Sequence, residues 1–259
     1  MQSEHIVTEA VRTAGIRVPP RFLPSTGSTN ADLLRAAAEG APAWTVEVAG
    51  HQEAGRGRLG RPWVDRAGTS LLVSVLLRPP IPPAEAPLVG LAAAAAMAAA
   101  LEEAAGVGAT CKWPNDVLAG GRKLCGVLPE AVVEGDRLAC VVVGAGLNLT
   151  QAEEEFPQEL RGRATSVAAA GGRPEPGAVL ESYLWRLREI VEDGPRGFPS
   201  RVLEDYRPRC ETIGRTVRAE TPGGPMEGFA IGIGPFGELL IEAGGRVAPV
   251  TFGEVEHLR

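Results

Sequence analysis

A loop rich in glycine and arginine is the clearest candidate for chemistry in this sequence. The segment GRGRLGRPW, residues 55–63, places Arg56, Arg58 and Arg61 among three glycines. Glycine lets backbone amides approach a ligand closely, and guanidinium groups offer charge-assisted, bidentate hydrogen bonds to phosphate or carboxylate. The GxxxxGK[ST] pattern of a P-loop is absent, and no GxGxxG opens a helix here. We therefore predict an anion-binding loop of another kind; a solvated basic turn and a nucleic-acid-binding loop are the alternatives.

Both lysines of the chain lie in one short segment. Only two of the 26 Lys and Arg residues are lysine, Lys112 and Lys123. Because an ammonium and a guanidinium group do different chemistry, this clustering favours a specific role for the two lysines. The alternative is a bias toward arginine that left two lysines here by chance. The motif KWPND, residues 112–116, sets Asn115 and Asp116 beside the first lysine across a proline-stiffened corner. Asp116 can bind Mg²⁺ or accept a proton, and an Asx turn that caps a hairpin is the alternative.

A hairpin with its reversal at residues 119–121 would return Lys123 to the KWPND corner. Two ammonium groups near three guanidinium groups form a strong local positive charge in a protein of net charge −6. Such a site suits a polyanion like a nucleoside triphosphate, whose phosphates offset the repulsion. Trp63 can stack on a purine or belong to the core. Asn148 can contact an adenine edge or complete a turn.

A polar triplet precedes a predicted helix. Ser28, Thr29 and Asn30 supply two hydroxyls and an amide ahead of ADLLRAAAEG, in which apolar residues recur at helical spacing. These side chains can bind a small polar head group, or they can serve only as the N-terminal cap. Gly40 is expected to end the helix in a left-handed conformation.

Further strands and helices must position these groups. The other predicted elements are strands at 44–49, 70–77 and 138–149 and helices at 84–105 and 179–191. The first two strands enclose the loop of residues 50–69, whose length is typical of a functional segment. The strand at 138–149 is expected at the centre of the sheet. After residue 213, short strands separated by Gly and Pro predict a small β-barrel of about 45 residues, with a boundary near residue 212.

Composition excludes several classes of protein. A chain of 259 residues with 44% hydrophobic residues suits one large domain plus a small module. Its acidic total argues against bulk nucleic-acid binding. The N-terminus lacks the charge and apolar run of a signal peptide, and the alanine-rich run at 87–101 is too short and weak to span a bilayer. Four scattered cysteines and three histidines exclude structural zinc and indicate free thiols, so a cytoplasmic protein is expected.

Five motifs together resemble those of the biotin protein ligases, in that family's order and spacing. They are STN at 28–30, GRGRLGRPW at 55–63, KWPNDVL at 112–118, RKLCGVLPE at 122–130 and GAGLNL at 144–149. The closing GEVEHLR resembles the family's C-terminal domain, so the resemblance covers about residues 22–259. It implies an α+β fold, with a mixed β-sheet flanked by helices as in class II aminoacyl-tRNA synthetases and in the biotin and lipoate ligases. The implied domains are a catalytic domain at 1–211 and an SH3-like β-barrel at 212–259.

The resemblance implies a two-step reaction. The biotin carboxylate attacks the α-phosphate of ATP to give biotinyl-5′-AMP, and a lysine amine of a carboxylase's biotin carrier domain then attacks the activated carbonyl. The implied catalytic residues are Lys123, Arg58 and Asp116. The implied biotin contacts are Ser28, Thr29, Asn30, Gln52, Gly55, Arg56, Gly57, Arg58, Lys123, Gly126 and Gly144. The implied ATP contacts are Arg56, Arg58, Arg61, Trp63, Lys112, Asn115, Lys123 and Asn148.

The resemblance also implies which metal ion and partners the protein binds and which it does not. Mg²⁺ is expected with the ATP phosphates rather than in a site made by the protein alone, with Asp116 as its candidate protein ligand. The carrier protein is the expected partner, without specific DNA or a membrane, and the enzyme is expected to be a monomer or a homodimer. About 20 residues precede the catalytic domain, too few for the winged-helix domain with which some relatives repress transcription.

Two departures and two rivals accompany this interpretation. Leu59 stands where many relatives carry arginine, and Pro129 replaces a β-branched residue, which can shift the edge pairing of its strand. Lipoate or octanoate transferases share the implied fold but lack the GRGRxGR loop. A DNA-binding regulator that senses biotinyl-5′-AMP is the other rival, and it would need the missing N-terminal domain.

Overall fold

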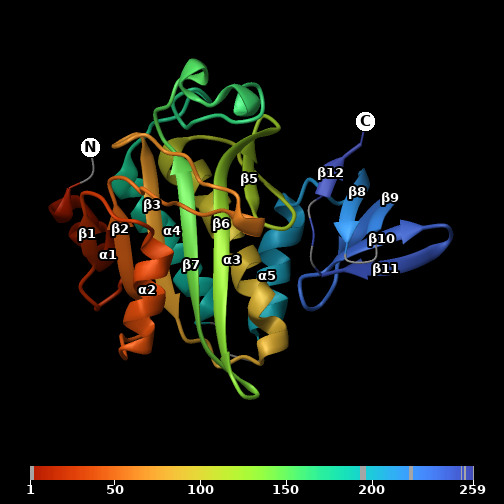
Figure 1. Cartoon of the computed structure of the whole chain (residues 1–259), viewed down its shortest axis with the longest axis horizontal. Helices are drawn as coiled ribbons and strands as arrows, with labels where there is room; N and C mark the ends of the chain where they lie inside the picture. The colour runs from red at the N-terminus through yellow and green to blue at the C-terminus, as the bar shows by residue number, and fades with distance from the viewer. Residues whose placement is uncertain (1–2, 193–196, 222–223, 252, 254, 259) are drawn as a thin grey trace.

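A seven-stranded mixed sheet forms the larger part of the protein (Figure 1). The computed structural model describes residues 3–192, 197–221, 224–251, 253 and 255–258. The strand order is β1-β2-β3-β7-β6-β5-β4, in which only β1 and β2 are parallel neighbours. The strands are β1 (Arg21–Leu23), β2 (Thr45–Ala49), β3 (Ser70–Leu77), β4 (Thr110–Lys112), β5 (Asp116–Ala119), β6 (Arg122–Glu134) and β7 (Arg137–Asn148).

The two faces of this sheet are covered differently. The α-helices are α1 (Glu4–Thr13), α2 (Thr29–Ala38), α3 (Ala86–Ala100), α4 (Pro176–Val191) and α5 (Phe198–Tyr206). Figure 1 shows α2 in front of the sheet and α3 and α4 behind it. Along β3, Val73 and Val75 belong to the main core with α3 and α4, whereas Leu76 belongs to a smaller cluster with Leu33 of α2. This alternation follows from the two-residue period of a strand.

The alanine-rich helix α3 is the central helix of the core. Its helical run continues as a π-helical turn to Ala105 and ends at Gly106, whose φ is +70°. The sequence-based argument that this run is too short and weakly apolar to span a bilayer was wrong, because the helical stretch Pro83–Ala105 is long and apolar enough by composition. However, 83% of its apolar window is buried inside the protein. Small side chains let this helix lie close against the sheet and against α4. Its apolarity is therefore explained by the protein core.

A second, antiparallel sheet follows near the C-terminus (Figure 1). Its order is β11-β10-β9-β8-β12, from strands β8 (Thr216–Thr221), β9 (Gly224–Ile233), β10 (Leu239–Ala243), β11 (Arg246–Val250) and β12 (Val255–His257). The short strands expected after residue 213 are confirmed. Closure into a barrel is not seen in the described residues, because the outer strands β11 and β12 pair with β10 and β8 and not with each other.

Most of the expected elements around the motifs are confirmed. β7 is the fourth of the seven strands, at the centre of the sheet as expected. β5 and β6 form the predicted hairpin, and Gly120 and Gly121 take φ values of +55° and +74° at its reversal, which suits a tight turn with both central residues in the left-handed region. All four cysteines are buried and free. Pro129 of β6 packs against Gly90 of α3, beyond the part of β6 that pairs with β5.

Candidate active site

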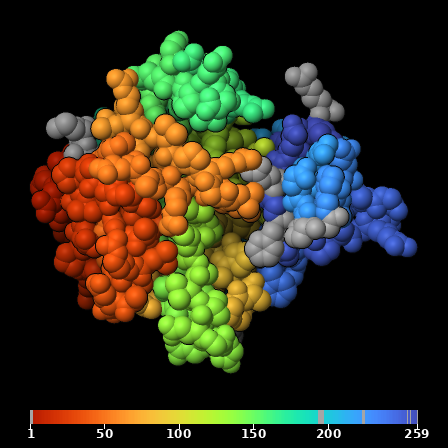
Figure 2. Space-filling view, in the orientation of Figure 1, coloured from red at the N-terminus to blue at the C-terminus, as the bar shows by residue number. Residues whose placement is uncertain are grey.

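The candidate site lies on the face of the large sheet that α2 covers. Pairing register brings Asp116, Gly126 and Gly146 into one row across β5, β6 and β7. A neighbouring row contains Gly144 of β7 and Ser74 of β3. Figure 2 shows the Gly and Arg loop, in orange, lying across the green strands between the N-terminal part and the C-terminal sheet. The motifs therefore meet on one surface.

The polar triplet at the start of α2 is part of a buried hydrogen-bond network. Ser28 is the N-cap, and its hydroxyl accepts a hydrogen bond from the amide of Ala31. Thr29 donates through its amide and hydroxyl to Oε1 of Gln52, at 2.8 and 3.0 Å. The Thr29 hydroxyl also lies 2.7 Å from the hydroxyl of Ser74. The capping role is thus confirmed, and the triplet does more than cap.

The network continues through Asn30 to the arginine loop. Ser74 donates to Oδ1 of Asn30 at 2.6 Å, and Nδ2 of Asn30 donates to Glu130 and to the carbonyl of Leu128. Glu130 in turn pairs with Arg56 at 3.3 Å. A Cβ at Gly144 would lie 2.3 Å from Oδ1 of Asn30. Only a glycine at this position leaves room for the amide.

Trp63 covers bare backbone on the same face. A Cβ at Gly146 would lie 2.6 Å from the indole, and one at Gly126 would lie 3.0 Å from it. The ammonium group of Lys123 lies 5.9 Å from the centroid of the indole ring, within the usual range of a cation–π contact. Trp63 is therefore packed against the site floor rather than in the core behind the sheet.

The arginine loop folds as a tight hairpin of its own. Arg56 and Pro62 form a β-bridge, and the amide of Gly57 donates to the carbonyl of Arg61 at 2.7 Å. Leu59 and Gly60 turn the chain with φ values of +56° and +73°. The Leu59 side chain is exposed, so it does not restrict the positions of the neighbouring arginine side chains. A Cβ at Gly55 would lie 2.9 Å from the carbonyl oxygen of Trp63, which explains the glycine there.

The KWPND corner and the following strand bring the two lysines to one edge of this surface. Nζ of Lys123 lies 2.6 Å from Oδ1 of Asp116. Lys112 is the register partner of Asp116 across β4 and β5. Asn115 donates to the carbonyl of Val127 at 2.9 Å, which fixes the corner against β6. The predicted approach of both lysines to Asp116 is thus confirmed, and its carboxylate offsets part of their charge.

The C-terminal sheet supports this corner. The amide of Trp113 donates to Oγ1 of Thr212 at 3.0 Å, and its indole Nε1 donates to the carbonyl of Gly237 at 2.8 Å. Thr212 also lies 3.1 Å from Nε2 of His257. Burial, and then the nearby Lys112 and Arg215, lower the pKa of His257 to about 4, so the imidazole is neutral at physiological pH.

Arg58 links the loop to both parts of the protein. Its guanidinium lies 3.5 Å from Oδ1 of Asn115 and donates to the carbonyl of Gly253 at 3.3 Å. The arginine loop, the KWPND corner and the C-terminal sheet therefore converge at this side chain.

The remaining candidate, Asn148, lies at the end of β7. It is buried, and its Nδ2 donates to the carbonyl of Thr165 at 3.0 Å. This contact fits the turn role that the sequence left open, and a contact with adenine stays a prediction. Sequence reasoning assigned no role to Ser74 or Glu130. Ser74 could have been noticed as a polar residue inside the apolar run SLLVSVLL.

Metal-binding capacity within the described residues is small. No group of three or more His, Cys, Asp or Glu side chains is placed to hold a metal ion there. Asp116 is paired with Lys123, so it can add one carboxylate to an ion that phosphates already hold, but it cannot hold one alone.

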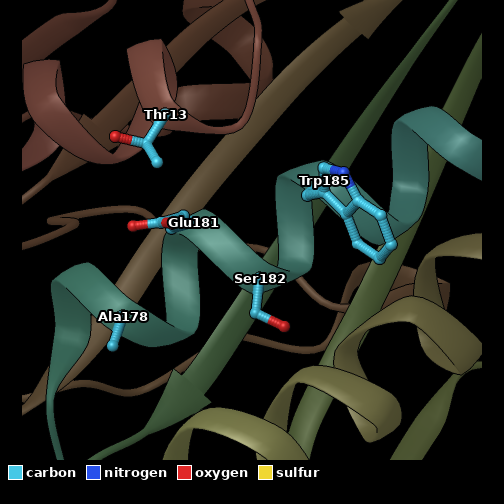
Figure 3. Close-up of a pocket in the computed structure, with 5 residues that line it drawn as sticks. All are labelled: Thr13, Ala178, Glu181, Ser182 and Trp185. Carbon is cyan, nitrogen blue, oxygen red and sulfur yellow. The ribbon is translucent and has the colours of Figure 1, made fainter.

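A surface cleft away from this site has a different character. It lies against α4 near the end of α1 and is lined by Thr13, Ala178, Glu181, Ser182 and Trp185 (Figure 3). α4 packs on the opposite face of the sheet, and none of the residues singled out from the sequence lines this cleft. With one carboxylate and no cationic side chain in its lining, the cleft lacks the groups that an anion would need.

Sequence comparison finds two matching families. The biotin/lipoate A/B protein ligase family matches residues 21–148, and the biotin protein ligase C-terminal domain matches residues 212–258. A biotin-[acetyl-CoA-carboxylase] ligase of Mycobacterium tuberculosis is 40% identical over 243 residues, which cover 90% of this chain and 87% of that protein. The bifunctional ligase/repressor BirA of Bacillus subtilis is 37% identical over 238 residues, which cover 90% of this chain and 71% of that protein.

A solved structure of a biotin protein ligase also matches this chain. A biotin protein ligase from Aquifex aeolicus, in complex with biotin and ATP, matches with a TM-score of 0.73 at 28% identity. The match covers 93% of this chain and 98% of that one.

Substitution of Gly144 by alanine should destabilise the protein. The added Cβ would meet Oδ1 of Asn30, so the amide must leave its bonds to Ser74 and Glu130. We expect the free energy of unfolding to fall by about 1–3 kcal/mol, measured by urea denaturation. Gly108→Ala is the matched control, because nothing lies within 4 Å of its Cβ position. Equal losses in the two variants would contradict the steric role of Gly144.

Proposed function

The chain belongs to the biotin protein ligase family, and on this premise we propose that it activates biotin with ATP and transfers it to a carrier protein. The biotin carboxylate attacks the α-phosphorus of ATP, and pyrophosphate leaves as biotinyl-5′-AMP forms. A lysine amine of the biotin carboxyl carrier domain of a carboxylase then attacks the activated carbonyl, loses a proton and displaces AMP. The observation that carries this proposal is the convergence of the arginine loop, Lys123 and the buried amide network on one face of the sheet.

A mechanism without a covalent enzyme intermediate agrees with the surroundings of the nearest thiol. Burial raises the pKa of Cys125 to about 12, since the negatively charged thiolate is poorly solvated there. A thiol in this condition is a poor nucleophile. Direct attack by the carboxylate of biotin needs no such group.

In our proposal the amide network receives the polar ring of biotin. Ser28, Thr29, Asn30 and Gln52 provide hydroxyl and amide groups in a corner that Ser74 and Glu130 hold in place. Gly126 and Gly144 carry no side chains of their own, so Trp63 and Asn30 lie directly on the sheet, and the apolar part of the ligand would lie beside them. Because the network is fixed by internal hydrogen bonds, little ordering is needed on binding.

The carboxylate and the phosphates would lie toward the basic side of the surface. Arg56, Arg58 and Arg61 bring positive charge to the arginine loop, and Gly55 and Gly57 let its backbone lie close to an anion. Lys123 would stabilise the negative charge that builds on the α-phosphate in the transition state, which contributes more to rate than equal binding of the ground state. Lys112 and Asn115 border this region, and Trp63 and Asn148 would flank the adenine.

Asp116 is proposed to act in the second step. Its carboxylate holds Lys123 at 2.6 Å and would lie near the incoming lysine amine of the carrier domain. Mg²⁺ would enter with the ATP phosphates and neutralise part of their charge. We propose that the larger sheet with its helices forms the catalytic domain, at 1–211, that residues 212–259 form the C-terminal domain, and that the enzyme works in the cytoplasm.

Exchange of labelled pyrophosphate into ATP tests the first step without a carrier protein. We expect exchange that depends on biotin and does not occur with lipoate or octanoate. Exchange with lipoate in place of biotin would indicate a lipoate or octanoate transferase instead. No exchange with any of the three acids would contradict the proposed adenylation.

Lys123→Gln should lower the rate of biotinyl-5′-AMP formation by well over tenfold, because the transition state loses a charge-assisted contact. Biotin should still bind with a dissociation constant close to that of the wild type, as measured by calorimetry. Arg122→Gln is the matched control, since Arg122 is adjacent and pairs only weakly with Glu153 at 3.4 Å. Unchanged adenylation in Lys123→Gln would disprove the role of this lysine.

Arg58→Gly should weaken retention of biotinyl-5′-AMP, because the loop would lose its link to Asn115 and to the C-terminal sheet. Released adenylate reacts with any accessible amine, so we expect biotin on bystander proteins as well as on the carrier. Blotting of a mixture of carrier and an unrelated lysine-rich protein measures this. Labelling that stays confined to the carrier would show that Arg58 does not retain the intermediate.

A further inference from the structure

Two carboxyl groups meet beneath the start of α2, next to the amide network. Glu47 lies in the middle of β2 and is fully buried, with 0% of its residue surface exposed. It is the register partner of Ser74 on β3 and of Arg21 on β1. Asp32 of α2 faces Glu47, so that a proton on either carboxyl group can be shared between them. A pair of acids in this place is not part of any motif identified from the sequence.

The two carboxyl groups differ in their partners. Asp32 accepts hydrogen bonds from Arg35 at 2.7 Å and from the hydroxyl of Thr26. Nη1 of Arg21 lies 3.2 Å from Oε2 of Glu47. Neither oxygen of Glu47, however, accepts a hydrogen bond from an N–H or O–H group among the described residues. Leaving a buried acceptor without a donor is costly, and a proton on Glu47 that bonds to Asp32 removes this cost.

The direction of both pKa shifts agrees with this arrangement. Burial, opposed by Arg21 and reinforced by Asp32, raises the pKa of Glu47 to about 7. Burial opposes the shift at Asp32, but hydrogen bonds from Thr26 and Glu47 and the charge of Arg35 hold its pKa below the usual value. Glu47 is thus the member of the pair that carries the proton.

The acid pair is connected directly to the amide network. Asp32 lies one helical turn after Thr29 on α2. Through Thr26 it also reaches the segment that carries Gln52, because Thr26 and Gln52 form a parallel β-bridge. Gln52 is the residue that accepts both hydrogen bonds of Thr29. Displacement of Asp32 would therefore disturb the corner from two sides.

We propose that protonated Glu47 is a positioning residue, which ties α2 to β2 through Asp32 and makes the affinity for biotin depend on pH. The inference rests on the proposed function, because biotin is the ligand whose affinity changes. The buried acid pair is the cause of that change. When Glu47 loses its proton, two carboxylates face each other, and the charges of Arg21 and Arg35, which lie at the protein surface, oppose their repulsion only in part. The start of α2 then loosens and biotin binds less tightly.

The sign of the pH effect follows from the raised pKa. A carboxyl group whose pKa is higher in the folded than in the unfolded protein stabilises the fold fully below the unfolded value of about 4.5, and this stabilisation is lost as pH rises through about 7. Asp32, with its lowered pKa, stays ionised throughout the interval from pH 6 to pH 8.5. Glu47 alone of the pair titrates in that interval.

Glu47→Gln separates this effect from others, because the amide N–H of glutamine can donate to Asp32 at every pH. We expect the dissociation constant of biotin for the wild type, measured by calorimetry, to rise about three- to tenfold from pH 6 to pH 8.5, and that of Glu47→Gln to stay level. Glu39→Gln, in the exposed residue that ends α2, is the matched control and should keep the wild-type slope.

Thermal unfolding without any ligand provides a second measurement. Glu47→Gln should melt at a higher temperature than the wild type at pH 8.5, and the difference should narrow as pH falls toward about 4.5, where the stabilisation by protonated Glu47 is complete. A wild-type affinity independent of pH would overturn the inference. So would a slope that survives in Glu47→Gln, since a group other than Glu47 would then cause it. Failure to bind biotin at any pH would contradict the proposed function instead, and parallel melting curves in the two proteins would still overturn the role of Glu47.

Discussion

Bare backbone on one face of the central strands is the constraint on which the site depends. Gly126, Gly144 and Gly146 lie on neighbouring strands, and a Cβ at any of them would meet either Asn30 or Trp63. A polar network and an aromatic ring can therefore lie directly on the sheet. Because the pleat alternates, the same strands present buried valines to α3 and α4 on the other face. A one-residue slip in register would exchange the two surfaces, so the core packing also fixes the site.

Rigid support extends from this surface to the charged groups. Asn30 is held by Ser74, Leu128 and Glu130, and Glu130 reaches Arg56. Each link places one group within hydrogen-bond distance of the next, so a continuous chain of contacts joins the amide corner to the arginine loop. This coupling suits a ligand with a neutral polar ring at one end and a carboxylate at the other. The arrangement positions both ends before the chemistry begins.

The elements formed by residues near one another in the sequence, and the contacts within recognisable motifs, could be predicted from the sequence. The helix after Ser28, the hairpin at Gly120 and Gly121 and the approach of Lys123 to Asp116 follow from spacing and turn chemistry. Ser74 and Glu130 were missed because their partner, Asn30, is 44 and 100 residues away in the chain. Glu47 was missed for the same reason, since an acid inside an apolar strand has no meaning until its neighbours are known. Helices α1 and α5 were not predicted, although both carry apolar residues at helical spacing.

The contacts of the KWPND corner with the C-terminal sheet have a consequence for the order in which the protein is made. Trp113 depends on Thr212 and Gly237, and Thr212 lies against His257. These partners are about 100 residues or more further along the chain, so a nascent chain that has reached α4 has the arginine loop and both lysines but not the support for their corner. Synthesis proceeds from the N-terminus, domains fold as they emerge, and the last contacts form only after residue 257 has left the ribosome. In a partly made chain, Trp113 of the KWPND corner therefore lacks its two hydrogen-bond partners.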